Sequence, residues 1–393
     1  MVQEYGADCQ IHASMKLSLL TDGITPYVTG GMQKHSYCLA RYFALQGVDI
    51  DLYHDYGSLF SRKEVDELSV FSPSEKEHIN GIAFDFPPPG KLPGHYLRRS
   101  KSFAKMLREA FLEQPLPDFI VAKGFTPWSL LDDRPANCPP IGVKFHGMNM
   151  FQTLTGTRGK LEAAMFRPVV RKLMRSSDYV FSYGGRITEI IEEQGVPLEQ
   201  ILEFPSGIES DWLERSEREM EEVRFIYVGR YERLKGIEEL YTAIRTLPAD
   251  LNTSFSFVGP IPEDKRMDHP RVKYYGQVSS RQDLRAIYQE HDVLVSTSYS
   301  EGMPNAILEA MGLGLTTFST DTGAVRALVN EKTGWLIESP PDPERIAAVL
   351  QEIVSDKTEI EQRKASAFDH IDKNFRWETI ISQMKQRIEG LIK

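Results

Sequence analysis

The chain has 393 residues, of which 41% are hydrophobic and 26% charged, and its formal net charge is −10. This length exceeds one ordinary hydrophobic core and predicts two domains, while the composition is that of a globular protein and excludes a disordered one. The acidic balance argues against a general nucleic-acid-binding protein, and no apolar run approaches the roughly 20 residues that a membrane-spanning helix needs.

The N-terminal segment 1–14 carries acidic and polar residues where a secretory signal would have a basic region followed by an apolar one. We expect this segment to be a flexible extension before the first strand, with Met15 as an alternative start. The three cysteines, Cys9, Cys38 and Cys138, are widely spaced and form no CxxC pair, so they predict neither a disulfide framework nor a zinc site. The chain is therefore expected to be cytoplasmic.

The first half alternates short β-branched runs with longer helical patterns, which is typical of βαβ units and a mostly parallel sheet. The predicted strands are residues 16–20, 48–53, 119–122, 141–145 and 179–182. The predicted helices are residues 32–46, 161–175 and 186–193. The proline-rich stretch 86–94 predicts a loop.

Two basic clusters in this half lie in amphipathic helical patterns. The first comprises Arg98, Arg99, Lys101, Lys105 and Arg108, and the second Arg167, Arg171, Lys172 and Arg175. One interpretation is a pair of solvated helix faces. The alternative is contact with an anionic acceptor or with the cytoplasmic face of the membrane, to which basic segments are attracted.

The pattern restarts near residues 203–209, where we place the hinge between two domains. The predicted strands of the second half are residues 224–228, 254–258, 272–275, 293–296 and 315–318, and helices are expected at about 236–247, 281–290, 304–313 and 343–355. Two successive doubly wound units without an obvious sequence repeat predict an α/β fold of two Rossmann-like domains facing each other. Ligands bind such open sheets beyond the carboxyl ends of the strands, so the loops that follow these strands are the candidate site.

Two carboxylates, Glu301 and Glu309, bracket a segment that follows a strand and opens a helix. Pro304 suits the first helical position, because it has no N–H to lose and its φ is already fixed. Glu309 lies among apolar neighbours and needs either solvent or a partner. Gly302 and the helix N-terminus add exposed N–H groups. The segment suits a ligand with an anionic middle and hydroxyl-bearing ends.

Other loop residues have both a functional and an ordinary interpretation. Gly30 and Gly31 precede a helix and allow close approach to an anion, but such pairs are also common in turns, and no GxGxxG fingerprint supports a dinucleotide-dependent dehydrogenase. Arg230 and Lys235 follow a predicted strand and suit a diphosphate, or they are solvated cations. His146, directly after the strand 141–145, reaches a ligand or caps the strand.

Taken in order, these residues resemble the retaining glycosyltransferases of family 4, which have the two-domain architecture called GT-B. The resemblance runs over nearly the whole chain. The matching segments are residues 30–35, 145–147, 206–208, 228–230, 235–236, 276–278 and 300–311, and 375–378 resembles the final segment that crosses back to the first domain.

The resemblance implies a nucleotide-sugar donor held mainly by the second domain. Arg230 and Lys235 would hold the diphosphate, Glu309 the ribose hydroxyls, Glu301 the transferred sugar, and His146 the sugar and the reacting centre. The remaining implied donor contacts are Gly30, Gly31, Gly229, Val278, Gly302, Met303, Pro304 and Asn305.

The resemblance also assigns the domains. Residues 15–205, with the C-terminal helix 375–393, would bind the acceptor, and residues 206–374 the donor. It implies retention at the anomeric carbon, with no metal and no other cofactor. A UDP-sugar is the first choice of donor and GDP-mannose the next, and the acceptor would be a glycan, a lipid-linked molecule or a small molecule. The alternatives are a sugar-nucleotide epimerase or hydrolase, and an inactive nucleotide-sugar-binding subunit.

Overall fold

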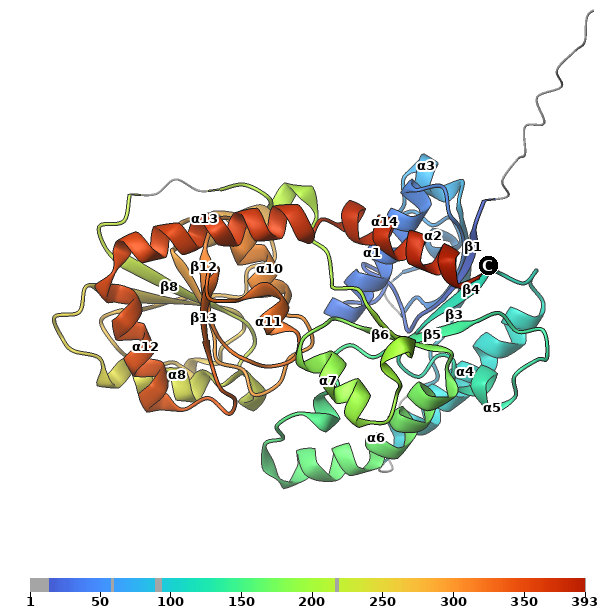
Figure 1. Cartoon of the computed structure of the whole chain (residues 1–393), viewed down its shortest axis with the longest axis horizontal. Helices are drawn as coiled ribbons and strands as arrows, with labels where there is room; N and C mark the ends of the chain where they lie inside the picture. The colour runs from blue at the N-terminus through green and yellow to red at the C-terminus, as the bar shows by residue number, and fades with distance from the viewer. Residues whose placement is uncertain (1–13, 58–59, 89–93, 216–218, 393) are drawn as a thin grey trace, which may run out of the picture.

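The computed structural model describes residues 14–57, 60–88, 94–215 and 219–392. Two α/β bodies lie along the long axis of the molecule, each built on a parallel sheet with helices packed against it (Figure 1). The expected N-terminal extension, apart from Ser14, lies outside the described residues, as do residues 89–93 of the expected proline-rich loop.

The first sheet has seven parallel strands in the order β3-β2-β1-β4-β5-β6-β7. They are β1 (Lys16–Leu20), β2 (Asp49–Asp55), β3 (Ile79–Phe84), β4 (Phe119–Lys123), β5 (Ile141–Lys144), β6 (Tyr179–Ser182) and β7 (Ile201–Glu203). Apolar residues dominate the central strands because both faces of a parallel sheet are covered by helices. The strand order reverses direction between β1 and β4, which is where a doubly wound sheet opens a crevice for a ligand.

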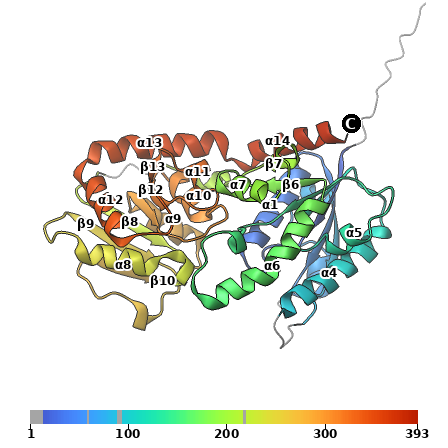
Figure 2. The same cartoon turned by 60° about the horizontal axis from the view of Figure 1, so that its bottom comes forward.

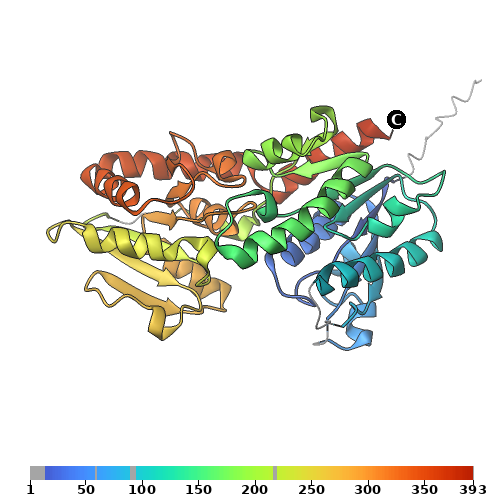
Figure 3. The ribbon, with the colours of Figure 1, turned by 90° about the horizontal axis from the view of Figure 1, so that it is seen from below.

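Seven helices accompany this sheet in the described residues. They are α1 (Gly31–Leu45), α2 (Arg62–Asp66), α3 (Pro73–Lys76), α4 (His95–Leu112), α5 (Trp128–Asp132), α6 (Gly156–Ser176) and α7 (Arg186–Glu193). Figure 3 shows α4, α5 and α6 grouped on one side of this body. Helix α6 begins five residues before the predicted start.

The second sheet has six parallel strands in the order β10-β9-β8-β11-β12-β13. They are β8 (Val223–Val228), β9 (Thr253–Val258), β10 (Val272–Gly276), β11 (Val293–Ser296), β12 (Thr316–Thr320) and β13 (Gly334–Ile337). The helices of this body are α8 (Ile237–Thr246), α9 (Arg281–Gln289), α10 (Asn305–Gly312), α11 (Val325–Leu328), α12 (Pro343–Ser355) and α13 (Lys357–Asn374). The predicted pair of doubly wound α/β bodies is confirmed.

The chain crosses between the bodies twice, and the two crossings lie side by side. Helix α13 runs along the second body and α14 (Trp377–Leu391) returns to the first, as predicted (Figures 1 and 2). The Ile208 N–H donates to the Phe375 carbonyl over 2.7 Å. Trp377 then stacks on Tyr42 of α1, with ring centroids 5.9 Å apart. These contacts hold the second crossing beside the first and anchor α14 on the first body.

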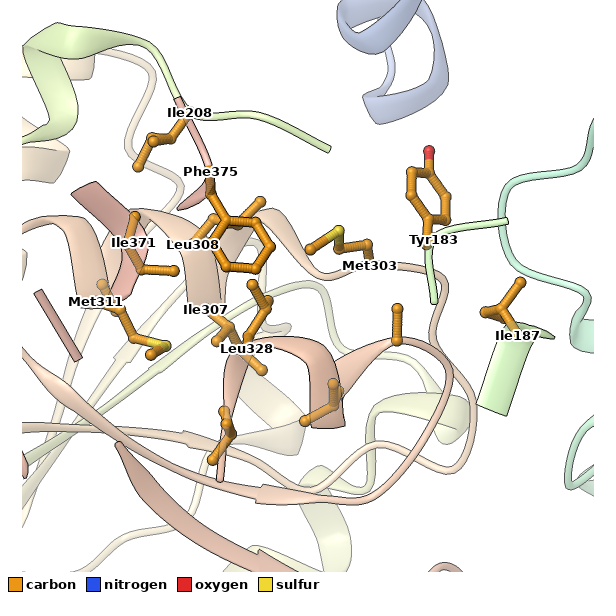
Figure 4. Close-up of a cluster of buried hydrophobic side chains, with 14 of the residues drawn as sticks. Tyr183, Ile187, Ile208, Met303, Ile307, Leu308, Met311, Leu328, Ile371 and Phe375 are labelled. Carbon is orange, nitrogen blue, oxygen red and sulfur yellow. The ribbon is translucent and has the colours of Figure 1, made fainter. Parts of the chain in front are cut away.

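A buried apolar cluster continues from one body into the other. Figure 4 shows Met303 of the second body between Tyr183 of the first body, on its right, and the side chains of α10 and α13, on its left. The cluster places the loop after β11 against the loop after β6. None of the helices in the described ranges combines the length and apolarity needed to cross a membrane.

Candidate active site

A cavity of about 320 Å³ lies between the two bodies. We call it the cleft. Its first-body wall is formed by the start of α1 and by the loops after β5 and β6, and its second-body wall by the loops after β8 and β11. Eight of the thirteen predicted site residues line it: Gly31, His146, Arg230, Lys235, Glu301, Gly302, Met303 and Asn305. The structure thus brings together residues from both halves of the sequence.

A lysine–carboxylate pair stands on the second-body wall. Lys235 Nζ lies 2.6 Å from Glu301 Oε1, and the Ser298 hydroxyl donates to the same oxygen over 2.6 Å. The Glu301 side chain is 11% exposed and that of Lys235 28%. An ammonium group has three N–H donors, so Lys235 can bond Glu301 and a ligand oxygen at the same time.

The pair depends on a close approach of two loops. Gly236, next to Lys235, has φ +63°, and a Cβ there would lie 1.8 Å from the Thr297 carbonyl oxygen. Any other residue would be strained by its positive φ and would also collide with the backbone. Gly236 therefore brings the loop after β8 against the loop after β11.

The second-body wall is hydrogen-bonded to the first body at the Glu301 loop. Gln152 Nε2 donates to the Glu301 carbonyl over 2.6 Å, and the Ser300 hydroxyl donates to Asn149 Oδ1 over 3.0 Å. A Cβ on Gly302 would lie 2.2 Å from the His146 carbonyl oxygen, so only glycine permits this contact. Sequence reasoning missed Gln152 and Asn149, although both closely follow the His146 motif.

His146 is neutral and has one ring nitrogen free. Its Nδ1 lies 2.6 Å from the Tyr183 hydroxyl, while its buried Nε2 has no hydrogen-bond partner among the described residues. Burial, with the charges of Lys123 and Lys144, lowers the pKa of the imidazole well below its usual range. The strand ends at Lys144, so His146 lies one residue further into the loop than predicted.

Two buried lysines at the ends of first-body strands were not predicted as site residues. Lys123 Nζ donates to the Met32 carbonyl over 3.0 Å and to the Ser36 hydroxyl over 2.8 Å, and burial lowers its pKa to about 7. Lys144 Nζ donates to the Phe204 carbonyl over 2.8 Å. Each lysine is the last residue of an otherwise apolar strand, and such a position is buried in a parallel sheet. This pattern could have identified both residues from the sequence.

Glu309 occupies a narrower space beside the cleft, together with Gly31 and Asn305. Its side chain is 16% exposed and its nearest charged partner is Lys34 of α1, 3.6 Å away. Burial raises the pKa of this carboxyl group, and Lys34 opposes the rise. Pro304 is the N-cap of α10 and not its first helical residue, because its ψ of 115° is extended.

Arg230 lines the cleft, and the remaining predicted residues Gly30, Gly229 and Val278 are not part of its lining. The Arg230 side chain is 71% exposed and lies 3.1 Å from Glu232. Gly30 is the N-cap of α1, and the Gly229 N–H donates to the Val258 carbonyl over 2.9 Å. Val278 packs against the buried cluster that joins the bodies.

The two basic clusters are largely engaged within the first body. Lys172 of α6 and Lys101 of α4 both contact Asp132, with N···O distances of 2.6 and 3.4 Å, and Arg108 pairs with Asp133. These ion pairs connect α4, α5 and α6, which favours a structural role. Contact with a membrane stays a prediction. No group of three or more His, Cys, Asp or Glu side chains in the described residues is arranged to hold a metal ion.

The chain matches two protein families. Residues 29–212 match the family described as Glycosyltransferase Family 4, and residues 222–356 match that described as Glycosyl transferases group 1. TuaC of Bacillus subtilis (strain 168), assigned to teichuronic acid biosynthesis as a glycosyltransferase, is 32% identical over 158 residues, which are 37% of this chain and 40% of TuaC. The chain therefore matches less than half the length of this relative.

Two solved structures share the fold. Sucrose-phosphate synthase of Thermosynechococcus elongatus has a TM-score of 0.77 at 20% identity, with 96% of this chain and 99% of that chain covered. Anabaena HepE in complex with UDP and glucose has a TM-score of 0.66 at 17% identity, with 96% and 100% covered.

Proposed function

Because the chain belongs to glycosyltransferase family 4, with the GT-B fold, we propose that it moves a sugar from a nucleoside-diphosphate sugar to a hydroxyl of an acceptor, with retention at the anomeric carbon. The observation that carries this proposal is the cleft itself. It sets Arg230, Lys235 and Glu301 of one body opposite His146 of the other. Cations, a carboxylate and a neutral imidazole around one cavity suit a diphosphate attached to a sugar.

The donor's diphosphate lies against Arg230, Lys235 and the N-terminus of α10 in this proposal. A helix N-terminus offers unpaired N–H groups and a partial positive charge to an anion. The ribose hydroxyls then reach Glu309, and the transferred sugar lies between Glu301 and His146. The fold shared with HepE, solved with UDP and glucose, supports a UDP-sugar as first choice.

In the reaction, the bond between the anomeric carbon and a phosphate oxygen breaks, and the electron pair leaves with the diphosphate. Lys235 and Arg230 stabilise the charge that grows on that oxygen, because fixed cations interact more strongly with the transition state than with the ground state. The acceptor hydroxyl attacks from the same face and passes its proton to the leaving phosphate. These two cations and the α10 N-terminus supply the positive charge, so we propose transfer without a metal ion.

The neutral state of His146 fits a hydrogen-bonding role. The ring contacts Tyr183 through Nδ1, and its free Nε2 is available to a sugar hydroxyl. A charged imidazolium would repel the oxocarbenium-like centre, which burial prevents by lowering the pKa.

A thermal-shift screen against UDP, GDP, ADP and their common sugars, with and without EDTA, tests the proposal. A ligand that binds only the folded protein raises the melting temperature according to RT ln(1 + [L]/Kd). We expect a shift with one nucleotide that EDTA does not change. The absence of a shift with every nucleotide would contradict the donor assignment. Product formed from the donor alone, without acceptor, would favour the epimerase or hydrolase alternative.

A further inference from the structure

A second cavity adjoins the cleft on the first-body side of His146. It has a volume of about 180 Å³ and shares His146, Gly147 and Asn149 with the cleft. The His146 loop therefore separates the two spaces, and a group in either one lies beside the same imidazole. We call the second space the aromatic cavity.

The walls of the aromatic cavity are mainly aromatic. They include Phe86, Tyr96, Phe103, Phe125 and Phe145. Phe86 and Phe103 have ring centroids 4.8 Å apart, and Phe125 contacts both Tyr96 and Phe145 edge to face at 6.0 and 5.7 Å. The negative face of an aromatic ring attracts C–H groups that carry partial positive charge, so these walls suit the C–H face of a ring-shaped ligand.

One carboxylate, Asp22, lines this apolar space. It follows β1 at the carboxyl end of the sheet, next to the β4 end where the strand order reverses. Its loop is held by the Gly23 N–H, which donates to the Thr21 hydroxyl over 3.1 Å. Its carboxylate is influenced by its own backbone N–H and by the charge of Lys123, and it forms no side-chain hydrogen bond with another described residue. Burial raises the pKa of its carboxyl group, and the charge of Lys123 and the backbone hydrogen bond oppose the rise.

Lys123 is the only lysine or arginine among the described residues that line the aromatic cavity, and its hydrogen-bond donors are already in use. Lys123 Nζ reaches the Met32 carbonyl, the Ser36 hydroxyl and His35 Nδ1, 3.1 Å away, and these three contacts use all the donors of an ammonium group. An anionic ligand would find no unused N–H donor on Lys123 and would meet the Asp22 carboxylate. A wholly apolar ligand would leave the Asp22 carboxylate with no donor beyond its own backbone N–H, which is costly away from water.

We propose that the aromatic cavity receives one uncharged sugar unit of the acceptor, which donates a hydroxyl hydrogen bond to Asp22 and lays its C–H face on the aromatic walls. This inference rests on the glycosyltransferase function proposed above. A sugar ring combines hydroxyl donors, which suit the Asp22 carboxylate, with an apolar face, which suits the aromatic walls. The volume is below the roughly 300–1,000 Å³ of pockets for drug-sized ligands, so it suits a single ring.

The test measures the binding of simple glycosides to the full chain by ligand-observed NMR titration. The probes are the methyl glycosides of glucose, galactose, mannose and N-acetylglucosamine, the methyl glucuronide as a charged counterpart, and p-cresol as an apolar one. We expect one or more neutral glycosides to bind, and Asp22→Asn to weaken the tightest of them about tenfold or more. Asp85→Asn, at an exposed carboxylate outside the cavity, should leave the affinity unchanged.

A second pair of variants tests the cavity by filling it. Ser100 of α4 is buried and lines the aromatic cavity, whereas Ser102 on the same helix is exposed. Ser100→Leu should abolish glycoside binding and Ser102→Leu should not. The thermal shift produced by the donor nucleotide is recorded for every variant, since neither Asp22 nor Ser100 lines the cleft. An unchanged shift shows that the variant is folded.

The outcomes separate this inference from the proposed function. The inference is overturned if no neutral glycoside binds, if the glucuronide or p-cresol binds as tightly as the best neutral glycoside, or if Asp22→Asn binds that glycoside with wild-type affinity. A nucleotide that still shifts the melting temperature in those cases leaves the proposed function standing. A chain that binds glycosides but no nucleotide would retain the aromatic cavity's assignment as a sugar site and contradict the donor assignment.

Discussion

The two walls of the cleft differ in the burial and the charge of their ionisable groups. On the first-body wall, burial lowers the pKa of both His35 and His146, and both imidazoles are neutral. On the second-body wall, Arg230 is largely exposed and Lys235 pairs with Glu301 at the surface of the cavity. One cleft can therefore present different chemistry to two parts of the same donor. In the proposed function, the cations of the second-body wall hold the diphosphate, and the first-body wall offers neutral imidazoles to the transferred sugar.

The largest effect is expected from removing a cation of the second-body wall. Lys235→Ala should lower kcat/KM by about 10²–10³-fold, or about 3–4 kcal/mol, because a group that stabilises developing charge is lost. Lys265→Ala, which removes a solvent-exposed lysine beside Asp264, is the matched control. Initial rates with the donor identified by the thermal-shift screen provide the measurement. A wild-type kcat/KM in Lys235→Ala would show that Lys235 does not stabilise the charge that develops on the leaving diphosphate.

The buried bases of the first body should make it sensitive to acid. Burial lowers the pKa of His54, at the end of β2, to about 4 from its usual 6.5. Between these pH values His54 binds a proton in the unfolded chain but not in the folded chain. The unfolding free energy therefore falls as the pH drops from 6.5 to 4. The loss is about 3 kcal/mol at most.

His54→Phe keeps the ring that stacks on Tyr27 and removes the titrating group. Urea unfolding of both proteins at several pH values between 6.5 and 4.5 should show a shallower pH dependence in the variant. Parallel pH curves would contradict the assignment of a buried neutral histidine.

Glu309 is a partly buried carboxylate of the second body, with a side chain that is 16% exposed. Glu309→Gln should weaken nucleotide binding about tenfold, or about 1.4 kcal/mol, with a smaller change in kcat, since a charge-assisted bond to the ribose is lost in ground state and transition state alike. Glu352→Gln, an exposed glutamate on α12, is the control. Calorimetric Kd values that stay unchanged in Glu309→Gln would refute the ribose role.

The smallest effect is expected where the two walls meet. Gln152→Ala removes side-chain bonds to the Glu301 and Gly147 carbonyls and should destabilise the contact between the bodies by about 1 kcal/mol. A small fall in melting temperature should accompany it, compared with Gln386→Ala on the exposed face of α14. A melting temperature equal to that of the wild type would show that this contact adds nothing to the closed arrangement.

The fold was readable from the sequence where strands are apolar and bounded by turn residues. The predicted strands 16–20, 179–182 and 293–296 agree with the structure at both ends. Strands β3 and β7 were missed: Asn80-Gly81 interrupts the apolar pattern of β3, and β7 has only three residues. Neither β13 nor α13 was predicted.

More of the site residues on the second-body wall than on the first-body wall could be predicted from the sequence. Arg230, Lys235 and Glu301 stand in loops directly after strands, where the general rule for open sheets places ligands. Asp22, Lys123 and Gln152 were missed because their positions depend on strand order and on contacts between the bodies. A single sequence does not reveal that β1 lies next to β4, which is what brings Asp22 and Lys123 together.

We propose that the cations of the second-body wall hold the donor's diphosphate without a metal ion. Calorimetric titration with the nucleoside diphosphate chosen by the screen, in EDTA, tests it with the wild type and with Arg230→Ala/Lys235→Ala. We expect the wild type to bind, the double variant to lose about 100-fold or more in affinity, and the affinity for the nucleoside without phosphates to fall much less between the two proteins. Binding that EDTA abolishes, or that the double variant retains in full, would contradict it.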